Sequence, residues 1–214
     1  MNILLIPLKI LIGTIATWIA RREYAFLVGV ILINMVLISE LGAKYVEIFG
    51  FITNAGNVYH AVTLFCMSII VERFSRQDAF KAVNIVFLLL VYFAVSKYIA
   101  INLQTTVDGN EVVQSALLNA QFNNSRILVA SFAAFWFVNW IFIMTYDWAK
   151  NKFKQLWSRM IVSCLVAQFY DSVVFFSLAF FGILPLDLIL EFMIVGFFFK
   201  SFIHIMTIPI FNKI

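Results

Sequence analysis

Apolar residues along the chain form seven long runs that short polar stretches separate. The runs span residues 3–20, 25–43, 52–71, 80–101, 126–147, 157–181 and 188–210. A helix needs about 20 apolar residues to cross the hydrocarbon of a bilayer, so most runs are long enough, and the first and third are marginal. The pattern predicts an all-α fold: a polytopic membrane helix bundle with six core transmembrane helices plus an extra N-terminal helix.

Composition supports this class and excludes others. Only 12% of the residues are charged and 64% are hydrophobic, whereas soluble domains carry about 25% charged residues. We therefore expect one integral membrane domain over residues 1–214, with the extra helix in 1–24 and the core in 25–214. The lipid bilayer is therefore the predicted environment of this domain. The net charge of +4 indicates no nucleic-acid partner, because the basic residues cluster at helix ends.

Motifs for nucleotide-driven or hydrolytic chemistry are absent from the sequence. It contains no GxxxxGK(S/T) phosphate loop, no HExxH zinc motif and no GxSxG nucleophile turn. Cys66 and Cys164 lie inside apolar runs, which favours neither a disulfide framework nor a metal site. We expect no cofactor, no metal and no enzymatic activity, which leaves a transporter or binding protein as the leading class.

Lysine and arginine fall mainly on one side of the predicted membrane. The connections after the first, third and fifth runs, together with the C-terminus, hold ten of the fifteen basic residues: Arg21, Arg22, Arg73, Arg76, Lys81, Lys150, Lys152, Lys154, Arg159 and Lys213. Short loops rich in positive charge stay in the cytoplasm. We therefore predict a cell-membrane protein with its N-terminus outside and its C-terminus in the cytoplasm.

The sixth run carries polar residues near the middle of the membrane. Relative to Gln168, the residues Cys164, Asp171 and Ser172 lie at i−4, i+3 and i+4, so all four share one stripe of a helix. An ionised carboxylate at this depth costs roughly 2.5–3.5 kcal/mol on insertion scales. The stripe must therefore face protein, water or a ligand instead of lipid.

The seventh run has Lys200 near its middle, with Gly196 and His204 one turn away on the same face. Asp171 and Lys200 both lie near the bilayer midplane, which makes them candidates for a buried ion pair. Such a pair would either hold helices six and seven together, each charge compensating the other, or open to a substrate or proton during transport. The sequence leaves both roles open.

Further polar residues lie in the third and fifth runs. The third opens with TNAGNVYH, whose Gly and two Asn predict a broken or late-starting helix that packs in protein or lines a cavity. Asn54, Asn57 and His60 recur at three-residue spacing and share a face, although a hydrogen-bonded interior histidine is the commoner role for His60. The fifth run carries Ser131 and Asn139.

Polar residues between the runs are assigned to surfaces. Glu40 and Lys44 stand at i, i+4 near the end of the second run and predict an interfacial pair, while Glu72 is interpreted as part of a solvated cytoplasmic end. The stretch 102–125 is predicted to be an outer connector with a short interfacial helix. A lid over an outward-facing cavity is the other interpretation of that stretch.

Three stretches resemble motifs of the queuosine precursor transporter family, which are vitamin-uptake-transporter-like integral membrane proteins. They are FGFITNAGNVYHAVTLFCMSIIVERFSRQDAFKAV, RILVASFAAF and the sixth run, and the resemblance covers about residues 44–210. Ser68 and Phe142 stand where the family usually has Asp, so Asp171 is the acid that remains at mid-depth. The matching residues are Glu72, Ala79, Lys81, Arg126, Ala130, Ser131, Ala134, Arg159, Ser163, Gln168, Asp171, Ser172, Phe175, Lys200 and Pro209.

The resemblance implies import of a 7-deazaguanine precursor of queuosine, a queuine-like or cyano- or aminomethyl-deazaguanine base used in tRNA modification. Such a nucleobase-like molecule presents N–H donors beside a carbonyl, which a carboxylate and an amide such as Asp171 and Gln168 complement. Phe175, Tyr170 or Trp136 could stack on its ring. The predicted substrate-binding residues are Asp171, Gln168, Asn139, Lys200, Ser131, Ser172, Asn57 and His60.

Two other functions stay open from the sequence. One is a substrate-binding membrane subunit of an energy-coupling-factor type vitamin importer, which would dock on a separate ATP-driven module. The more distant one is an intramembrane enzyme that uses Asp171 or His60. A separate energising module and a second copy of the chain are therefore the protein partners that the sequence leaves open.

Overall fold

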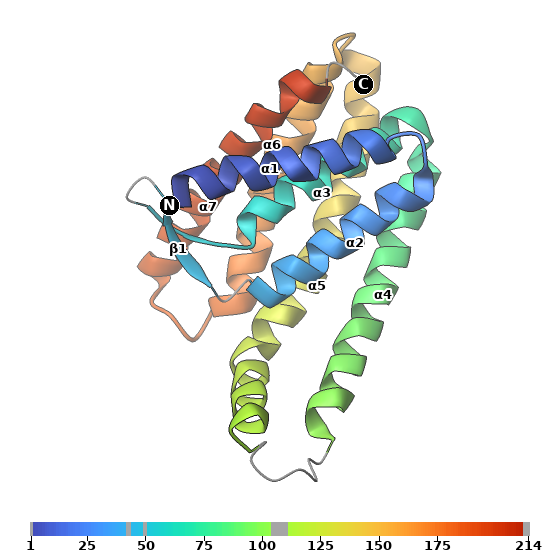
Figure 1. Cartoon of the computed structure of the whole chain (residues 1–214). Coiled ribbons are helices and arrows are strands. Elements are labelled where there is room, and N and C mark those ends of the chain that lie inside the picture. The colour runs from blue at the N-terminus through green and yellow to red at the C-terminus, as the bar shows by residue number, and fades with distance from the viewer. Residues whose placement is uncertain (1, 42–43, 49–50, 104–110, 212–214) are drawn as a thin grey trace.

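A computed structural model describes residues 2–41, 44–48, 51–103 and 111–211 of the chain. Its described helices agree in number with the seven apolar runs and pack side by side as a bundle, which confirms the predicted all-α membrane fold (Figure 1). The elements are α1 (Asn2–Ala20), α2 (Tyr24–Leu41), β1 (Tyr45–Ile48), β2 (Phe51–Asn54), α3 (Asn57–Arg73), α4 (Arg76–Asn102), α5 (Glu111–Lys152), α6 (Leu156–Phe180) and α7 (Leu186–Phe211).

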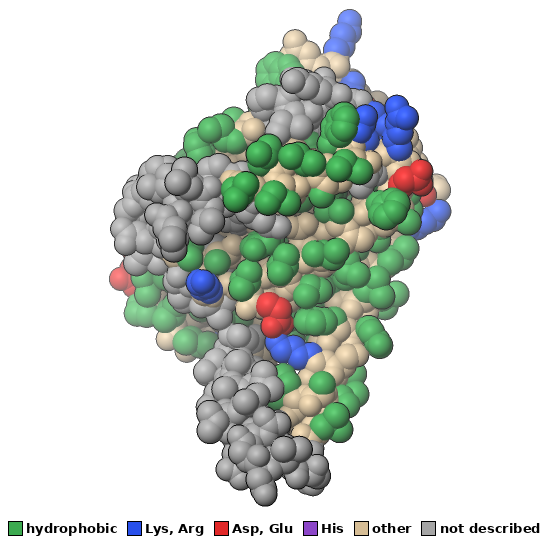
Figure 2. All heavy atoms as spheres, viewed as in Figure 1, with side chains coloured by type: hydrophobic (Ala, Val, Ile, Leu, Met, Phe, Trp, Pro, Cys, Tyr) green, Lys and Arg blue, Asp and Glu red, His purple; other side chains and the backbone are tan. Residues whose placement is uncertain are grey.

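Five of the described helices are long and apolar enough to cross a membrane. They are α2, α4, α5 from Ser125 onward, α6, and α7 up to Met206. The outer face of the bundle is apolar as well, because Ile19, Leu88 and Phe198 are 65–70% exposed, and hydrophobic side chains cover much of the face shown in Figure 2. An apolar surface of this kind is stable against lipid and not against water, so the chain is an integral membrane protein.

Helix α3 forms the centre of the bundle. Every residue from His60 to Val71 is buried, and α3 contacts α1, α2, α4, α5 and α7. In Figure 1 α1 passes in front of α3. A helix of 17 residues is about 26 Å long at 1.5 Å per residue, less than the roughly 30 Å of hydrocarbon. Its neighbours supply the contact with lipid, so α3 can remain short.

The third run begins with a hairpin and not with a helix. Strands β1 and β2 pair antiparallel, Tyr45 opposite Asn54, and the backbone N–H of Ala55 donates to the carbonyl of Lys44 at 2.9 Å. The helix then starts at Asn57, which confirms the late start that the Gly and Asn residues predicted. The strands themselves were not predicted, since four-residue segments of aromatic and β-branched residues are too short to be distinguished from the ends of apolar runs.

Helix α5 corrects the predicted organisation of residues 102–125. Instead of a separate interfacial helix, residues from Glu111 onward begin a single helix that continues to Lys152. In Figure 1 this first part of α5 extends beyond the other helices beside the end of α4. Residues 104–110 lie outside the described part of the chain.

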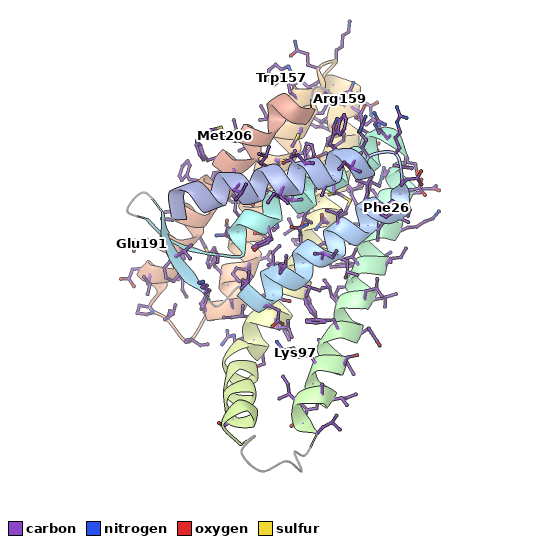
Figure 3. All side chains as sticks on the ribbon, viewed as in Figure 1. Phe26, Lys97, Trp157, Arg159, Glu191 and Met206 are labelled. Carbon is purple, nitrogen blue, oxygen red and sulfur yellow. The ribbon has the colours of Figure 1, made fainter. Side chains whose placement is uncertain are left out.

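The charged pairs near the helix ends also differ from the prediction. Glu40 pairs with Lys97 of α4, whose Nζ donates to Oε1 and Oε2 at 2.6 and 2.8 Å, and Figure 3 shows Lys97 near the end of α2. The predicted partner, Lys44, follows the end of the helix and is exposed. An i, i+4 pair requires both residues to be helical, and α2 ends at Leu41.

Helices α6 and α7 approach closely at Gly196. A Cβ placed on Gly196 would lie 2.9 Å from Cε2 of Phe176, whereas a Cβ on Gly29 of α2 would meet nothing within 4 Å. Small residues let membrane helices pack tightly without a hydrophobic driving force between them. This contact fixes how α7 presents its polar face to α6.

We expect Gly196→Leu to lower the free energy of unfolding by about 1–3 kcal/mol, because the added side chain forces α6 and α7 apart. Gly29→Leu is the matched control and should keep or slightly raise stability, since Leu favours helix more than Gly does. Thermal unfolding of the purified variants in detergent measures both. Equal melting temperatures for the two variants would contradict the close packing of α6 on α7.

Candidate functional site

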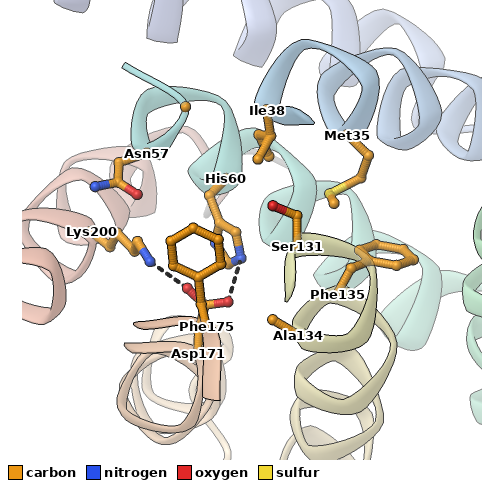
Figure 4. A pocket seen from close by; sticks show the side chains of 11 residues that line it. Met35, Ile38, Asn57, His60, Ser131, Ala134, Phe135, Asp171, Phe175 and Lys200 are labelled. Atoms are coloured by element: carbon orange, nitrogen blue, oxygen red, sulfur yellow. Dashed lines mark hydrogen bonds and ion pairs between the residues drawn. The ribbon is translucent and has the colours of Figure 1, made fainter. Parts of the chain in front are cut away.

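A pocket lies between the helices at the end of the bundle where α2 ends and α3 begins. The empty space at this pocket, counting the open solvent at its mouth, is about 430 Å³. Figure 4 shows its polar and aromatic side chains converging from several helices. The lining residues are Met35, Ile38, Gly56, Asn57, His60, Ser131, Ala134, Phe135, Asp171, Phe175 and Lys200.

Asp171 of α6 is the centre of this pocket. Its Oδ2 accepts a hydrogen bond from Nζ of Lys200 on α7, and its Oδ1 lies 3.6 Å from Nε2 of His60 on α3 (Figure 4). Asp171, Lys200 and His60 are only 5%, 3% and 7% exposed. The ion pair that the sequence suggested is therefore present, and the two charges compensate each other where an isolated charge would be costly.

Gln168 lies one turn before Asp171 and holds the other side of the His60 ring. Its Nε2 is 3.2 Å from Nδ1 of His60. The Gln168 side chain is fully buried, and its Oε1 has no hydrogen-bond partner among the described residues. A buried acceptor without a partner costs roughly 1–3 kcal/mol. Gln168 is not among the residues that line the pocket, so this acceptor is buried behind the lining and not open to it.

The remaining walls of the pocket are mixed in character. Ser131 of α5 donates to the carbonyl of Ile127 at 2.8 Å, so its oxygen keeps acceptor capacity. Asn57 lies at the start of α3, just after Gly56. Phe175 lies one turn after Asp171, and the centre of its ring is 6.0 Å from Nζ of Lys200. The pocket thus combines one charged cluster with an aromatic face.

Several residues predicted for the site lie elsewhere. Asn139 is fully buried, donates to the carbonyl of Phe135 at 2.8 Å and does not line the pocket. Ser172 faces α7, with its Oγ 3.9 Å from the Cβ position of Gly196, and is also outside the lining. Of the aromatic candidates, Tyr170 and Trp136 are exposed on the outer surface of the bundle, by 40% and 39%.

Comparison with known proteins identifies the family. Residues 54–214 match the family described as "Putative vitamin uptake transporter". The chain belongs to this family. A curated relative from Bacillus subtilis, named "Probable queuosine precursor transporter", is 27% identical over 171 residues, which cover 78% of this chain and 73% of the relative. No solved structure matches the chain.

At the opposite end of the bundle, charged residues of this vitamin uptake transporter family member form ion pairs that the sequence did not reveal. Glu72 at the end of α3 accepts from Arg159 at the start of α6, Nη1 to Oε1, at 2.8 Å, and its Oε2 lies 3.9 Å from Nζ of Lys150 on α5. Nζ of Lys150 also donates to the carbonyl of Val71 at 3.0 Å. These contacts connect three helix ends, so Glu72 belongs to an interhelical cluster and not to a solvated end.

The sequence contained the residues of this cluster but did not indicate that they meet. Glu72 and Arg159 both belong to the motif matches, yet they are 87 residues apart. Spacing along one helix cannot show that two charges on different helices meet. Within the part of the chain that the structure describes, no three His, Cys, Asp or Glu side chains gather closely enough to hold a metal ion.

Proposed function

We propose that the chain imports a 7-deazaguanine precursor of queuosine across the cell membrane, with the pocket around Asp171 as its binding site. The observation that carries the proposal is a buried carboxylate, shared by a lysine and a histidine, inside a pocket between the membrane-spanning helices. Ionisable residues within membrane segments mark substrate or ion pathways. The family of the chain and the printed name of its relative from Bacillus subtilis support a transporter of this substrate class.

The chemistry of the pocket suits a flat base that carries donors and a carbonyl. Among the described residues, Oδ1 of Asp171 contacts Nε2 of His60 at 3.6 Å, a distance longer than a hydrogen bond, so it can accept N–H groups from the base. Nζ of Lys200, which also lines the pocket, can donate to the carbonyl. The ring of Phe175 supplies a face on which the base can stack. The pocket therefore offers both hydrogen-bond acceptors and a donor, which together match the donors and the carbonyl on the edge of a guanine-like base.

The shape of the bundle fits one state of a transport cycle. The pocket lies where α2 ends and α3 begins, and at the other end ion pairs of Glu72 with Arg159 and Lys150 connect α3, α5 and α6. In alternating access, a central site opens to one side of the membrane while the other side is shut. With the N-terminus outside and the C-terminus in the cytoplasm, as the basic loops suggest, the pocket mouth faces outward.

Complementation tests the proposal directly. A bacterial strain that can neither make nor import the base, and that expresses this chain, should regain queuosine in its tRNA when the medium contains cyano- or aminomethyl-deazaguanine or queuine. The empty vector is the control, and mass spectrometry of digested tRNA is the measurement. No queuosine with any of the bases, in cells that contain the protein in their membrane, would rule out this function.

The same experiment separates the other two functions. If queuosine appears only when genes for an ATP-driven module are present, and the chain co-purifies with that module, the chain is the binding subunit of an energy-coupling-factor type importer. If the cells accumulate a chemically altered base while uptake is unchanged, the chain is an enzyme. Uptake of the unaltered base by the purified chain in liposomes supports a transporter that acts alone.

A further inference from the structure

The charges that line the pocket balance each other without a ligand. The carboxylate of Asp171 carries one negative charge, and the ammonium group of Lys200, which donates to Oδ2 of that carboxylate, carries one positive charge (Figure 4). His60, whose Nε2 lies 3.6 Å from Oδ1, adds either no charge or one positive charge. The other lining residues in the described part of the chain are uncharged. The net charge of the lining is therefore zero when His60 is neutral and plus one when it is protonated.

These charges lie in a buried environment. Asp171, Lys200 and His60 are at most 7% exposed, and Ser131 and Phe135, which line the pocket from α5, are at most 5% exposed. Charges in such surroundings interact more strongly than in water, because the effective dielectric constant is far lower. A charged ligand that enters the pocket loses hydration, and this cost is offset only where the pocket supplies an opposite charge.

The lining has no spare carboxylate for a cation. An ammonium group that bound Asp171 would displace Lys200, and the lysine would then be buried beside it without a partner, which is costly. Near the end of α2, the carboxylate of Glu40 is held by Nζ of Lys97 at 2.6 and 2.8 Å. The described lining thus offers hydrogen-bond donors and acceptors to a base but no uncompensated negative charge.

We propose that the pocket selects among the precursors by charge: it binds a base with a neutral substituent, such as the cyano-deazaguanine, and excludes a base that carries an ammonium group. Lys200 sets this selection, because its charge cancels that of Asp171. A site can discriminate between two ligands by leaving the charge of one of them without a partner. This inference rests on the proposed function, because it concerns which base that function carries.

The candidate precursors differ in this property. The aminomethyl base is a primary alkylamine and is positively charged near pH 7, as the side chain of lysine is. The queuine-like base carries a secondary amine, which is charged as well. The cyano group is neutral. Selection by charge therefore separates the cyano base from the other two.

The test uses the purified full chain in liposomes at zero membrane potential and measures the exchange of labelled cyano-deazaguanine base at pH 7. The unlabelled competitors are the aminomethyl base and the hydroxymethyl base, which have nearly the same size and differ by one charge. The aminomethyl base should need at least about a tenfold higher concentration than the hydroxymethyl base for half-inhibition, which corresponds to about 1.4 kcal/mol. Labelled aminomethyl and queuine bases are measured in the same way.

The outcomes separate this inference from the proposed function. Exchange of the cyano base, with the tenfold or larger advantage of the hydroxymethyl competitor, supports both. A smaller ratio, a preference for the aminomethyl base, or exchange of a labelled cationic base alone overturns the selection by charge while the transport function stands. Absence of exchange for every candidate base overturns the transport function, and the inference with it. These measurements use the wild-type chain and do not depend on the folding of a variant.

A variant with one added negative charge tests the cause of the selection. Asn57 lines the pocket, and Asn57→Asp keeps the size of the side chain while giving the lining a spare carboxylate. Because Asn57 is the first residue of α3, where the helix dipole favours an acidic side chain, the variant should fold. We expect the ratio of the two competitors to shift at least about tenfold toward the aminomethyl base.

The matched control is Asn102→Asp, the same change at an exposed residue that ends α4 and does not line the pocket. Its ratio should equal that of the wild-type chain. An unchanged ratio in Asn57→Asp, with exchange intact, would exclude the charge balance of the lining as the cause of the selection.

Discussion

Asp171→Asn lowers uptake of the deazaguanine base at least about 100-fold while the protein still inserts into the membrane. The substitution keeps the size of the side chain but removes the charge, so hydrogen bonds from the base lose an ionised acceptor. Hydrogen bonds to charged groups contribute about 1.5–3 kcal/mol each. Two of them account for roughly 3 kcal/mol or more, and each 1.4 kcal/mol is tenfold in affinity or rate.

Initial uptake rates in the auxotrophic strain, corrected for the amount of protein in the membrane, measure this effect. Asp187→Asn is the matched control. It makes the same chemical change at a residue that is exposed at the start of α7 and does not line the pocket. It should transport like the wild-type chain. Wild-type uptake by Asp171→Asn would end the idea that Asp171 binds the substrate.

The second large effect concerns stability. Lys200→Met should lower the free energy of unfolding by about 3–5 kcal/mol, because it leaves the carboxylate of Asp171 buried without its partner. The double variant Asp171→Asn/Lys200→Met removes both charges and should recover most of this loss, since two neutral side chains can be buried without compensation. Thermal unfolding in detergent gives the values for the single and double variants.

The double-mutant cycle also separates structure from function at this pair. Additive losses, within about 0.5 kcal/mol, would show that the two residues do not interact. A coupling of about 2 kcal/mol or more, with uptake still absent in the stable double variant, would show that the pair has both a structural and a substrate-binding role. It holds α6 against α7, and its charges also bind the substrate. Recovery of stability and uptake together would assign the pair to structure alone.

The sequence alone could predict the features that repeat along one helix. Apolar runs predicted seven helices, because the cost of exposing backbone groups to hydrocarbon leaves helices as the only practical solution. The i, i+3 and i+4 spacing placed Gln168 and Asp171 on one stripe, and both are buried in the structure. The Gly and Asn residues before His60 predicted that α3 starts late.

Pairings between helices could be predicted only where few partners were available. Asp171 and Lys200 are the oppositely charged residues near the middle of α6 and α7, and because burial makes an unpaired charge costly, the sequence made them candidates for an ion pair. Near helix ends, water lowers that cost and many partners are acceptable. The i, i+4 spacing therefore favoured Lys44 as the partner of Glu40, whereas the fold brings Lys97 beside it.

The sequence by itself determined that this is a membrane helix bundle with a carboxylate and an amide on one inward stripe of α6. The tertiary structure decided which residues meet that stripe. Helix packing turns His60 and Lys200 toward Asp171 and turns Asn139 and Ser172 away from the pocket. The physical reason is that helical spacing fixes which side chains share a face, while the rotation and approach of neighbouring helices, as at Gly196, fix what that face contacts.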